Sequence, residues 1–533
     1  MAWKICIGLL VLVWLGACMG QTVELTTMYV DLYSTNMDPS CGMTKSQACS
    51  SISAARDSFL LLPVAQQSVR QAPYVYSPLK IIMTPGTYGH ANTKIDFFTF
   101  NVIIEAEIAG TVTITGLDMD DAFIVAPYAP QATNNYTYIT INNIHFDQFD
   151  KQVVQIDRKA VSFVRFNGCI FSNSRDAITL SGSSESSSLV FNNCIVSKNR
   201  DGALVFASDV KVLMYNVTFS NNINYQIFKG YASGITLENT LVVENSYYYM
   251  ENELWNGLIN IFGGDLTILN TQWKENNSPF QIYARQYDDL TQSPHLSQPT
   301  RIAIASSQFI NNNAETNPHS YSTLIYQGSF SGMLNITDSY LAYNRGNDVG
   351  AIYSDSETTV ARTSFLNNFG AEAAQIYHRN QSYYQNCTFT YDDTIEYTES
   401  KSQLYMEHVP YIAFTDTVFI YTDTDIINIP LIQCKNSTIK FYDSRIKSSD
   451  SSSTYPIHCI WGCTKAYSRY KLGCERDLPT SAPKASPNLS PSNETAKSVT
   501  NETSSSSAHL THPTSILLSI CISLTISICS SHF

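Results

Sequence analysis

One short residue pattern recurs along most of this chain at a nearly constant interval. It consists of an apolar residue, a variable residue, an Asn or another polar residue, a mostly small residue, a variable residue and a second apolar residue, which we use as the marker of each copy. Six of the eleven steps between markers are 23–25 residues, and the longest is 36. The markers are Phe146, Phe171, Val196, Phe219, Val242, Trp273, Phe309, Leu341, Phe365, Phe389, Phe419 and Ile446. Such a repeat, lengthened by insertions, is typical of a solenoid whose units stack on their neighbours.

The apolar residues within each copy predict strands. They fall at alternate positions, and no copy keeps a helical period of 3.6 residues. The residue two before each marker shares its parity and is expected to point inward as well. These inward residues are Ile144, Cys169, Cys194, Val217, Thr240, Thr271, Ser307, Ser339, Thr363, Cys387, Thr417 and Ser444.

Two columns of Asn are in phase with the markers. The column three residues before the marker contains Asn143, Asn193, Asn216, Asn239, Asn270 and Asn386, with Asp338, Asp416 and Asp443 in later copies. The column three residues after the marker contains Asn199, Asn222, Asn245, Asn276, Asn312, Asn344 and Asn368. The first column suits a bend repeated in every coil, because Asn tolerates turn conformations, and its side chains, stacked at about 4.8 Å, can pass hydrogen bonds from coil to coil. The sequence therefore predicts an all-β fold, a right-handed single-stranded parallel β-helix of about twelve or more coils with an Asn ladder.

The marker and the second Asn column spell Phe-x-x-Asn at 219–222, 309–312 and 365–368, and some copies continue into a Gly-Ala-aliphatic strand start. This pairing resembles the repeats of the chlamydial polymorphic outer-membrane proteins and of related extracellular repeat proteins in protists, over about residues 139–449. The resemblance implies a non-catalytic cell-surface glycoprotein that displays binding loops for adhesion. Its partner would be an extracellular glycan or a surface protein.

The N-terminal region has the features of a leader and a cap. Residues 1–20 read as a secretory signal peptide, with Lys4 before an apolar run. Residues 15–18 also resemble a bacterial lipoprotein box that would anchor Cys18. Residues 21–79, with a helix expected near 52–62, resemble the N-terminal cap of pectin-lyase-like β-helices, which would cover the first coil. We expect the β-helix itself over residues 80–450.

The cysteines predict staples at the two ends of the solenoid. Cys41 is expected to pair with Cys49, and pairs are expected among four cysteines in or near a C-terminal cap at 451–478. These four are Cys434, Cys459, Cys463 and Cys474, with their connectivity open. The Cys459-x-x-x-Cys463 spacing also fits half of a zinc site, but no second cysteine pair completes it. Cys169 and Cys194 are expected to be stacked core thiols, and Cys387 to stay unpaired.

The C-terminal composition and the sequons predict a glycosylated, anchored protein. Residues 479–513 form a Ser/Thr/Pro-rich stalk, and 514–533 a hydrophobic tail that is either a glycosylphosphatidylinositol signal or a membrane helix. We therefore expect the secretory route to the cell surface and a membrane anchor at the C-terminus. The sequons expected to carry sugar are Asn135, Asn276, Asn488, Asn493 and Asn501, whereas Asn216 and Asn386 are expected to be buried.

The net charge of −13 disfavours nucleic acid and acidic substrates. No residue pattern indicates a cofactor or a metal.

The pectin-lyase-like scaffold also hosts enzymes, so the alternative function is a polysaccharide lyase, glycoside hydrolase or epimerase. Two fragments partly resemble polygalacturonase motifs, but the rest of that catalytic set is missing. The remaining candidate is Arg175-Asp176 with Arg200-Asp201 on adjacent coils, where stacking would place the carboxylates about 5 Å apart, as in a retaining glycosidase. The competing reading pairs each Asp with a neighbouring Arg. Tyr247–Tyr249 with Trp255 fit either a sugar platform or loop packing. The sequence favours a binding protein over an enzyme.

Overall fold

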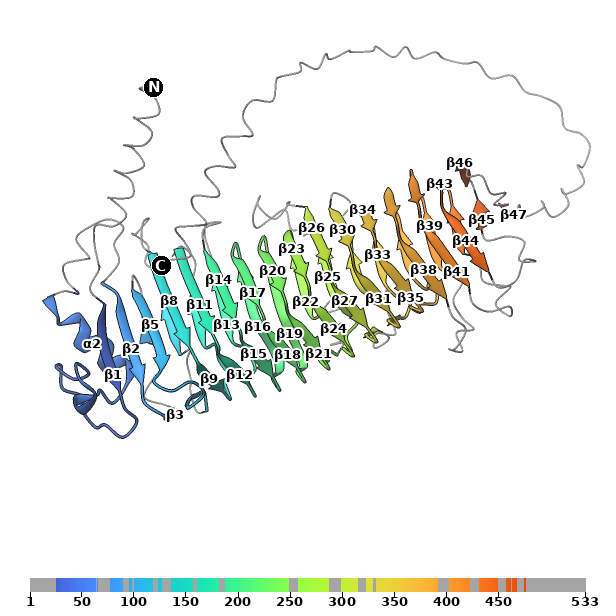
Figure 1. Cartoon of the computed structure of the whole chain (residues 1–533). Helices are drawn as coiled ribbons and strands as arrows, with labels where there is room; N and C mark the ends of the chain where they lie inside the picture. Colours follow the sequence, from blue (N-terminus) through green and yellow to red (C-terminus); the bar gives the residue numbers. More distant parts are fainter. Residues whose placement is uncertain are drawn as a thin grey trace, which may run out of the picture. The chain divides into compact units, whose positions relative to one another are not determined.

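The computed structural model shows three long parallel sheets wound into one right-handed parallel β-helix, which confirms the predicted fold (Figure 1). The chain divides into two units, residues 1–478 and 479–533, and every described residue belongs to the first. The structure describes residues 25–63, 65, 77–89, 95–97, 100–117, 123–126, 136–156, 161–181, 187–248, 257–286, 299–314, 323–328, 332–391, 402–421, 431–448, 457–461, 463–466 and 474–475.

Each complete coil passes through the first, second and third sheets in turn. The first sheet contains β1 (Thr26–Val30), β2 (Leu79–Met83), β5 (Asn101–Ala106), β8 (Tyr136–Asn142), β11 (Val161–Asn167), β14 (Ser188–Asn192), β17 (Lys211–Tyr215), β20 (Gly234–Glu238), β23 (Gly264–Leu269), β26 (Thr300–Ala305), β30 (Met333–Thr337), β34 (Glu357–Ala361), β37 (Ser382–Gln385), β40 (Ile412–Thr415), β43 (Thr438–Tyr442) and β46 (Thr464–Ala466).

The second sheet carries the markers. Its strands are β3 (Gly86–Tyr88), β6 (Val112–Thr115), β9 (Ile144–Asp147), β12 (Ile170–Ser172), β15 (Ile195–Ser197), β18 (Thr218–Ser220), β21 (Leu241–Val243), β24 (Gln272–Lys274), β27 (Gln308–Ile310), β31 (Tyr340–Ala342), β35 (Ser364–Leu366), β38 (Thr388–Tyr391), β41 (Val418–Tyr421) and β44 (Arg445–Ser448).

The third sheet closes each coil. Its strands are β4 (Ile95–Asp96), β7 (Ile124–Ala126), β10 (Val154–Ile156), β13 (Ile178–Ser181), β16 (Arg200–Ser208), β19 (Ile223–Tyr231), β22 (Ile259–Phe262), β25 (Phe280–Arg285), β29 (Thr323–Gln327), β33 (Ile352–Ser354), β36 (Ile376–His378), β39 (Leu404–Glu407), β42 (Ile432–Lys435), β45 (Ile457–Trp461) and β47 (Cys474–Glu475). A short pair, β28 (Asn313–Ala314) and β32 (Arg345–Gly346), lies in the turn before it.

The marker residues form the core, as predicted. Every marker whose side chain is described is at most 3% exposed, and so are most of the small residues two positions earlier. Rings stack from coil to coil: the centroids of Phe365 and Phe389 are 4.7 Å apart, and those of Phe389 and Phe419 are 5.2 Å apart. Buried and more exposed residues alternate along the strands because every second side chain faces this core.

The first Asn column forms a left-handed turn between the first and second sheets. All twelve residues three before a marker have positive φ, including Gly168, Ser306 and Arg362, which break the Asn/Asp pattern. Asn and Asp adopt this conformation at a lower cost than most other side chains, since their short polar groups bond locally. The Asn preference therefore reflects the backbone of the turn.

The buried ladder is formed by the second Asn column and not, as expected, by the first. Asn222 is 2% exposed, and its Nδ2 donates to Oδ1 of Asn245 at 2.7 Å and to the carbonyl of Val196 at 3.0 Å. Its Oδ1 accepts from both the Nδ2 and the backbone N–H of Asn199 at 3.0 Å. The same bonds recur along the column to Asn344. Each rung is thus a buried amide with its donors and acceptor satisfied.

Both ends of the ladder are closed by other side chains and backbone groups. The Ser174 N–H donates to Oδ1 of Asn199 at 2.9 Å, and Nδ2 of Asn368 donates to Oε1 of Gln375 at 2.6 Å. Gln375 in turn donates to Oε1 of Gln403 at 3.3 Å. The column therefore continues as glutamines where the Asn pattern stops.

The solenoid begins earlier than residue 80. Strand β1 pairs in parallel with β2, so the first sheet already starts at Thr26, inside the region expected to be a separate cap. The helix α2 (Ile52–Leu60) confirms the predicted helix, and Ser51 caps its N-terminus by accepting from the Ala54 N–H at 3.1 Å. A 3₁₀ turn, η1 (Lys45–Gln47), lies between β1 and α2. At the other end, β45, β46 and β47 extend the sheets beyond residue 450.

The cysteines follow the predicted staples. Cys41 pairs with Cys49, and Cys434 pairs with Cys463, which removes Cys463 from any zinc site. Cys169, Cys194 and Cys387 are buried free thiols, as predicted. The side chains of Cys459 and Cys474 lie outside the described part of the chain.

One glycosylation expectation was wrong. Asn276 is fully buried, and its amide belongs to the ladder, donating to Asn312 and to the Val242 carbonyl, so its side chain has no room for a sugar. Asn216 and Asn386, expected to be buried, are exposed at the left-handed turn. The residues around Asn135, Asn488, Asn493 and Asn501, the leader and the C-terminal tail lie outside the described residues.

The ladder generates a stability prediction. Replacing Asn312 by Ala removes four hydrogen bonds: the buried backbone N–H of Asn276 loses its acceptor, and Nδ2 of Asn276, Oδ1 of Asn344 and the Trp273 carbonyl each lose one bond. We expect the free energy of unfolding in denaturant to fall by at least about 3 kcal/mol. The matched control is Asn311→Gly, because Asn311 is exposed with a φ of 54° that glycine adopts freely; it should cost less than about 1 kcal/mol. Equal losses in the two variants would contradict a stabilising role of the ladder.

Candidate functional site

Five tyrosines stack along the outer face of the third sheet. Each follows an inward apolar residue of its strand, so it points away from the core. Successive ring centroids are 5.1, 4.9, 4.9 and 4.8 Å apart, and the planes deviate from parallel by 11–14°. The five are Tyr283, Tyr326, Tyr353, Tyr377 and Tyr405, on β25, β29, β33, β36 and β39.

The ring faces of this stack are already occupied. Tyr353 and Tyr377 are 5% and 9% exposed, because their rings cover each other and pack against Val349 and Ala373. A sugar ring cannot stack on faces that are in contact with other rings. The stack instead supplies a rigid backing and a row of phenol hydroxyls.

A row of charged side chains runs beside the tyrosines. Two residues after three of them come Asp355, Arg379 and Glu407, and the next coil adds Lys435. Nε of Arg379 lies 3.9 Å from Oδ1 of Asp355 and 3.8 Å from Oε2 of Glu407. Nζ of Lys435 is 2.6 Å from Oε1 of Glu407. The two carboxylates therefore flank one guanidinium, and their oxygens are separated by at most about 8 Å, a range that overlaps the carboxyl spacings of both retaining and inverting glycosidases.

The pKa values of the two carboxylates are shifted in opposite directions. Burial raises the pKa of Asp355, and the negative charge of Glu407 adds to this, against the opposing Arg379 charge and a Tyr353 hydrogen bond. Burial would also raise the pKa of Glu407, but hydrogen bonds from Lys435 and Tyr377 and the charges of Lys435 and Arg379 outweigh it, so its pKa is lowered. Oδ1 of Asp355 is buried and accepts no hydrogen bond. Asp355 is thus the group that holds a proton longer.

The tyrosine hydroxyls complete this network. The Tyr377 hydroxyl donates to Oε2 of Glu407 at 2.5 Å, and burial together with this bond raises the pKa of Tyr377. Tyr353 bonds to Arg379 and to Asp355. Each carboxylate is therefore oriented by one tyrosine of the stack.

The residues predicted from sequence occupy a different place. Asp176 accepts from the Ala203 N–H at 3.1 Å, and Asp201 accepts from Nδ2 of Asn224 at 2.9 Å. Nε of Arg175 donates to the Asp201 carbonyl at 3.3 Å, and Arg200 is exposed at the start of β16. The two carboxylates thus bond to groups of the next coil, and their catalytic role stays a prediction.

Two further sequence features are partly described. Tyr247 is 7% exposed and Tyr248 is 49% exposed, whereas Tyr249 and Trp255 lie outside the described residues.

A Ser–His–Asp cluster on the second sheet is arranged unlike a catalytic triad. The Ser172 hydroxyl donates to Asp147 at 2.6 Å and contacts Nε2 of His145 at 2.7 Å. A hydroxyl has one proton, so His145 donates to Ser172 and cannot take its proton.

The sequence carries a signal for the third-sheet site that the markers and the Asn columns do not include. Four copies of an aliphatic residue, Tyr, a variable residue and a charged residue occur along the third sheet, at 282–285, 352–355, 376–379 and 404–407. They lie between the markers, where no Asn indicates the register. Aligning the coils on these tyrosines places Asp355, Arg379 and Glu407 at equivalent positions.

Within the part of the chain that the structure describes, no cluster of His, Cys, Asp or Glu is suited to hold a metal. Among the same residues, helices long and apolar enough to cross a membrane are absent.

No protein-family model and no curated protein sequence matches this chain. Several solved structures of polysaccharide-processing enzymes are similar to it. The catalytic unit of a GH87 α-1,3-glucanase from Streptomyces thermodiastaticus is 10% identical, with a TM-score of 0.34, covering 73% of this chain and 63% of that chain. A GH136 lacto-N-biosidase from Eubacterium ramulus is 10% identical, with a TM-score of 0.25, covering 79% and 67%. The A-module of a mannuronan C-5 epimerase from Azotobacter vinelandii is 10% identical, with a TM-score of 0.23, covering 73% and 91%.

These similarities concern the fold alone. This chain spans 63% of the glucanase unit, and its residues are matched at low identity throughout. The resemblance of the repeats to the chlamydial proteins stays a prediction.

The charge row generates a prediction about stability and pH. Because the pKa of Glu407 is lowered in the folded protein, its ionised form stabilises the fold above the usual glutamate pKa, and this contribution is lost as the pH falls through the lowered value. Glu407→Gln should therefore reduce the free energy of unfolding by about 1–3 kcal/mol at neutral pH and by little in strong acid. Denaturant unfolding measured across pH tests this.

The control for this measurement is Glu244→Gln, which changes an exposed carboxyl far along the solenoid. It should leave the unfolding curve unchanged at every pH. A Glu407→Gln loss that persists undiminished in acid would contradict stabilisation by the ion pair.

Proposed function

We propose that the protein is a polysaccharide-processing enzyme whose proton donor is Asp355 and whose base is Glu407. The observation that carries the proposal is the pair of carboxylates on either side of Arg379, with pKa values moved in opposite directions. Two such groups in one place supply the acid and the base that glycoside cleavage requires.

The proposed reaction is hydrolysis of a glycosidic bond. Asp355 gives its proton to the leaving oxygen, and Glu407 removes a proton from the attacking water on the opposite face of the sugar. Carboxyl groups about 6.5–9.5 Å apart leave room for that water. Lys435 and Tyr377 favour the ionised form of Glu407, and burial raises the pKa of Asp355 and so favours its protonated form. Arg379 balances the charge between them.

The setting of the protein agrees with an extracellular substrate. The Cys41–Cys49 and Cys434–Cys463 disulfides support folding in an oxidising compartment. The leader at 1–20, the glycosylated stalk and the C-terminal membrane anchor remain part of the proposal. The partner would then be a glycan outside the cell, processed by a surface-bound protein, and the adhesive role inferred from the repeats would be secondary.

The first test is turnover. The purified protein is incubated with alginate, polygalacturonate, laminarin and α-1,3-glucan, and the release of reducing ends is measured. Asp355→Asn and Glu407→Gln should each lower the rate by at least about 100-fold, because each removes one proton-transfer partner. Asp338→Asn is the matched control, since Asp338 is an exposed carboxylate paired with Arg362 in a turn; it should leave the rate unchanged.

Three results would contradict this assignment. Turnover that survives both site substitutions would remove Asp355 and Glu407 from the chemistry. Turnover that disappears instead in the Asp176→Asn, Asp201→Asn double variant would move the site to the pair predicted from sequence. A protein that binds these polymers and cleaves none of them would be a binding protein.

The second test is the pH dependence of the rate. Activity needs ionised Glu407 and protonated Asp355, so the profile should be bell-shaped, with an acidic limb set by Glu407 and an alkaline limb set by Asp355. Lys435→Ala removes a hydrogen bond and a charge that lower the Glu407 pKa, so the acidic limb should move to higher pH. Lys447→Ala, an exposed lysine of the second sheet, should leave both limbs in place. An acidic limb that does not move would exclude Glu407 as the base.

A further inference from the structure

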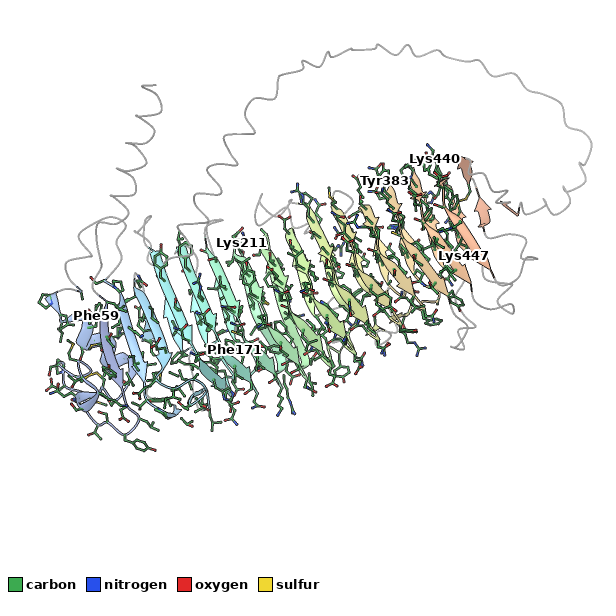
Figure 2. All side chains as sticks on the ribbon, viewed as in Figure 1. Phe59, Phe171, Lys211, Tyr383, Lys440 and Lys447 are labelled. Carbon is green, nitrogen blue, oxygen red and sulfur yellow. A yellow bond between two sulfur atoms is a disulfide. The ribbon has the colours of Figure 1, made fainter. Side chains whose placement is uncertain are left out.

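The last coils of the first sheet carry a cluster of exposed aromatic side chains, which we call the corner patch. It consists of Tyr383 on β37, Tyr411 directly before β40, and Lys440 and Tyr442 on β43. Tyr383 is 39% exposed and Tyr442 is 44% exposed, whereas Tyr353 and Tyr377 of the third-sheet stack are below 10%. Figure 2 shows Tyr383 and Lys440 along the same edge of the first sheet, in its orange part. The corner patch offers the open rings that the buried stack lacks.

The strand register fixes how these side chains lie. Tyr383 pairs with Ala413, and Ala413 pairs with Lys440, so all three share the outward face on successive strands. The small Ala413 separates the two large side chains. Tyr442 pairs with Thr415 and occupies the next outward position along β43. Strand β40, with its small Ala413, therefore lies between β37, which carries Tyr383, and β43, which carries Lys440.

Contacts within the patch hold its side chains in place. The rings of Tyr383 and Tyr411 are 5.7 Å apart and tilted by 50°, and Nζ of Lys440 lies 4.5 Å above the Tyr411 ring. Hydrogen bonding to Tyr442 raises the pKa of Tyr411 to about 12. Ordered rings cost less entropy on binding than free ones. The patch is thus preorganised while two of its rings remain exposed.

The corner patch continues directly from the acid–base site. Tyr383 comes four residues after Arg379, Tyr411 four residues after Glu407, and Lys440 five residues after Lys435. In each coil the chain turns from the third sheet into the first over these few residues, with His408 at a φ of 56° in one of the turns. The same three coils therefore carry Arg379, Glu407 and Lys435 on one side of the corner and the aromatic cluster on the other, and Asp355 lies on the coil before them.

We propose that the corner patch is a sugar-binding subsite that holds the glycan chain beyond the Asp355–Glu407 site. The exposed faces of Tyr383 and Tyr442 would pack against the C–H faces of pyranose rings, and Lys440 would donate to their hydroxyl or carboxylate oxygens. Aromatic rings with an apolar body and a polar tip suit a ligand that is apolar on its ring faces and polar at its rim. The path of the glycan across the corner rests on the proposed function.

The test is affinity electrophoresis of the full chain in gels that contain laminarin, alginate or polygalacturonate. The wild-type protein and the Asp355→Asn, Glu407→Gln variant should be retarded by at least one of these polymers. The Tyr383→Ala, Tyr442→Ala variant should bind that polymer at least about tenfold more weakly, because aromatic anchors dominate such interfaces. Tyr138→Ala is the matched control: Tyr138 is an exposed tyrosine of the same sheet, 36% exposed, on the distant strand β8.

The outcomes separate the two proposals. Full retardation of the Tyr383→Ala, Tyr442→Ala variant, or no retardation of the wild-type protein by any of the three polymers, would overturn the subsite. Wild-type retardation that depends on Tyr383 and Tyr442, without cleavage of any polymer, would support the subsite and reject the proposed enzyme. Thermal unfolding of each variant is measured in parallel. The Tyr383→Phe, Tyr442→Phe variant keeps both rings and should retain binding, so it tests the subsite even if the double alanine variant is misfolded.

Discussion

The regular cross-section of this solenoid depends on buried amide hydrogen bonds that repeat with the coil. Each Asn of the ladder satisfies groups of the coil before it and the coil after it, so a coil that slipped by one residue would leave buried donors and acceptors without partners. Left-handed turns lie on both sides of the second-sheet strands from β9 to β35. Ladder and turns together fix the length of the strand between them, and hence the register of the whole coil.

That register arranges the outer surface. In a parallel β-helix, equivalent outward positions lie about 4.8 Å apart on successive coils, so any residue type that repeats becomes a continuous row. The pairing of Ile352 with Ile376, and of Ile376 with Leu404, places three tyrosines in one stack and sets Asp355, Arg379 and Glu407 beside them. Arg379 then lies between the carboxylates of Asp355 and Glu407, and the pKa values of these two groups are shifted in opposite directions. The proposed acid–base pair on the outer surface therefore depends on the strand register, which the ladder in the interior helps to fix.

The predictable part of the molecule was the part with a strong repeating signal. Marker parity placed the inward residues correctly, and the first Asn column located the turn, but the continuous ladder expected in that column is formed by the second one. The glycosylation prediction failed at Asn276, because this residue was judged by its sequon and not by its place in the buried column. The start of the solenoid at Thr26 was missed because the long segment between β1 and β2 hides their pairing. The candidate site was missed because pKa shifts and ion pairs depend on which third-sheet strands lie next to each other, and that sheet carries no Asn marker.

The proposed chemistry depends most on Asp355 and Glu407 having opposite proton affinities, and carboxyl carbon NMR titration of the intact protein measures this directly, with Asp355→Asn and Glu407→Gln used to assign the two signals. Asp355 is expected to titrate above, and Glu407 below, the usual pH for its residue type. Ordinary values for both groups, or the reverse order, would contradict the assignment of acid and base.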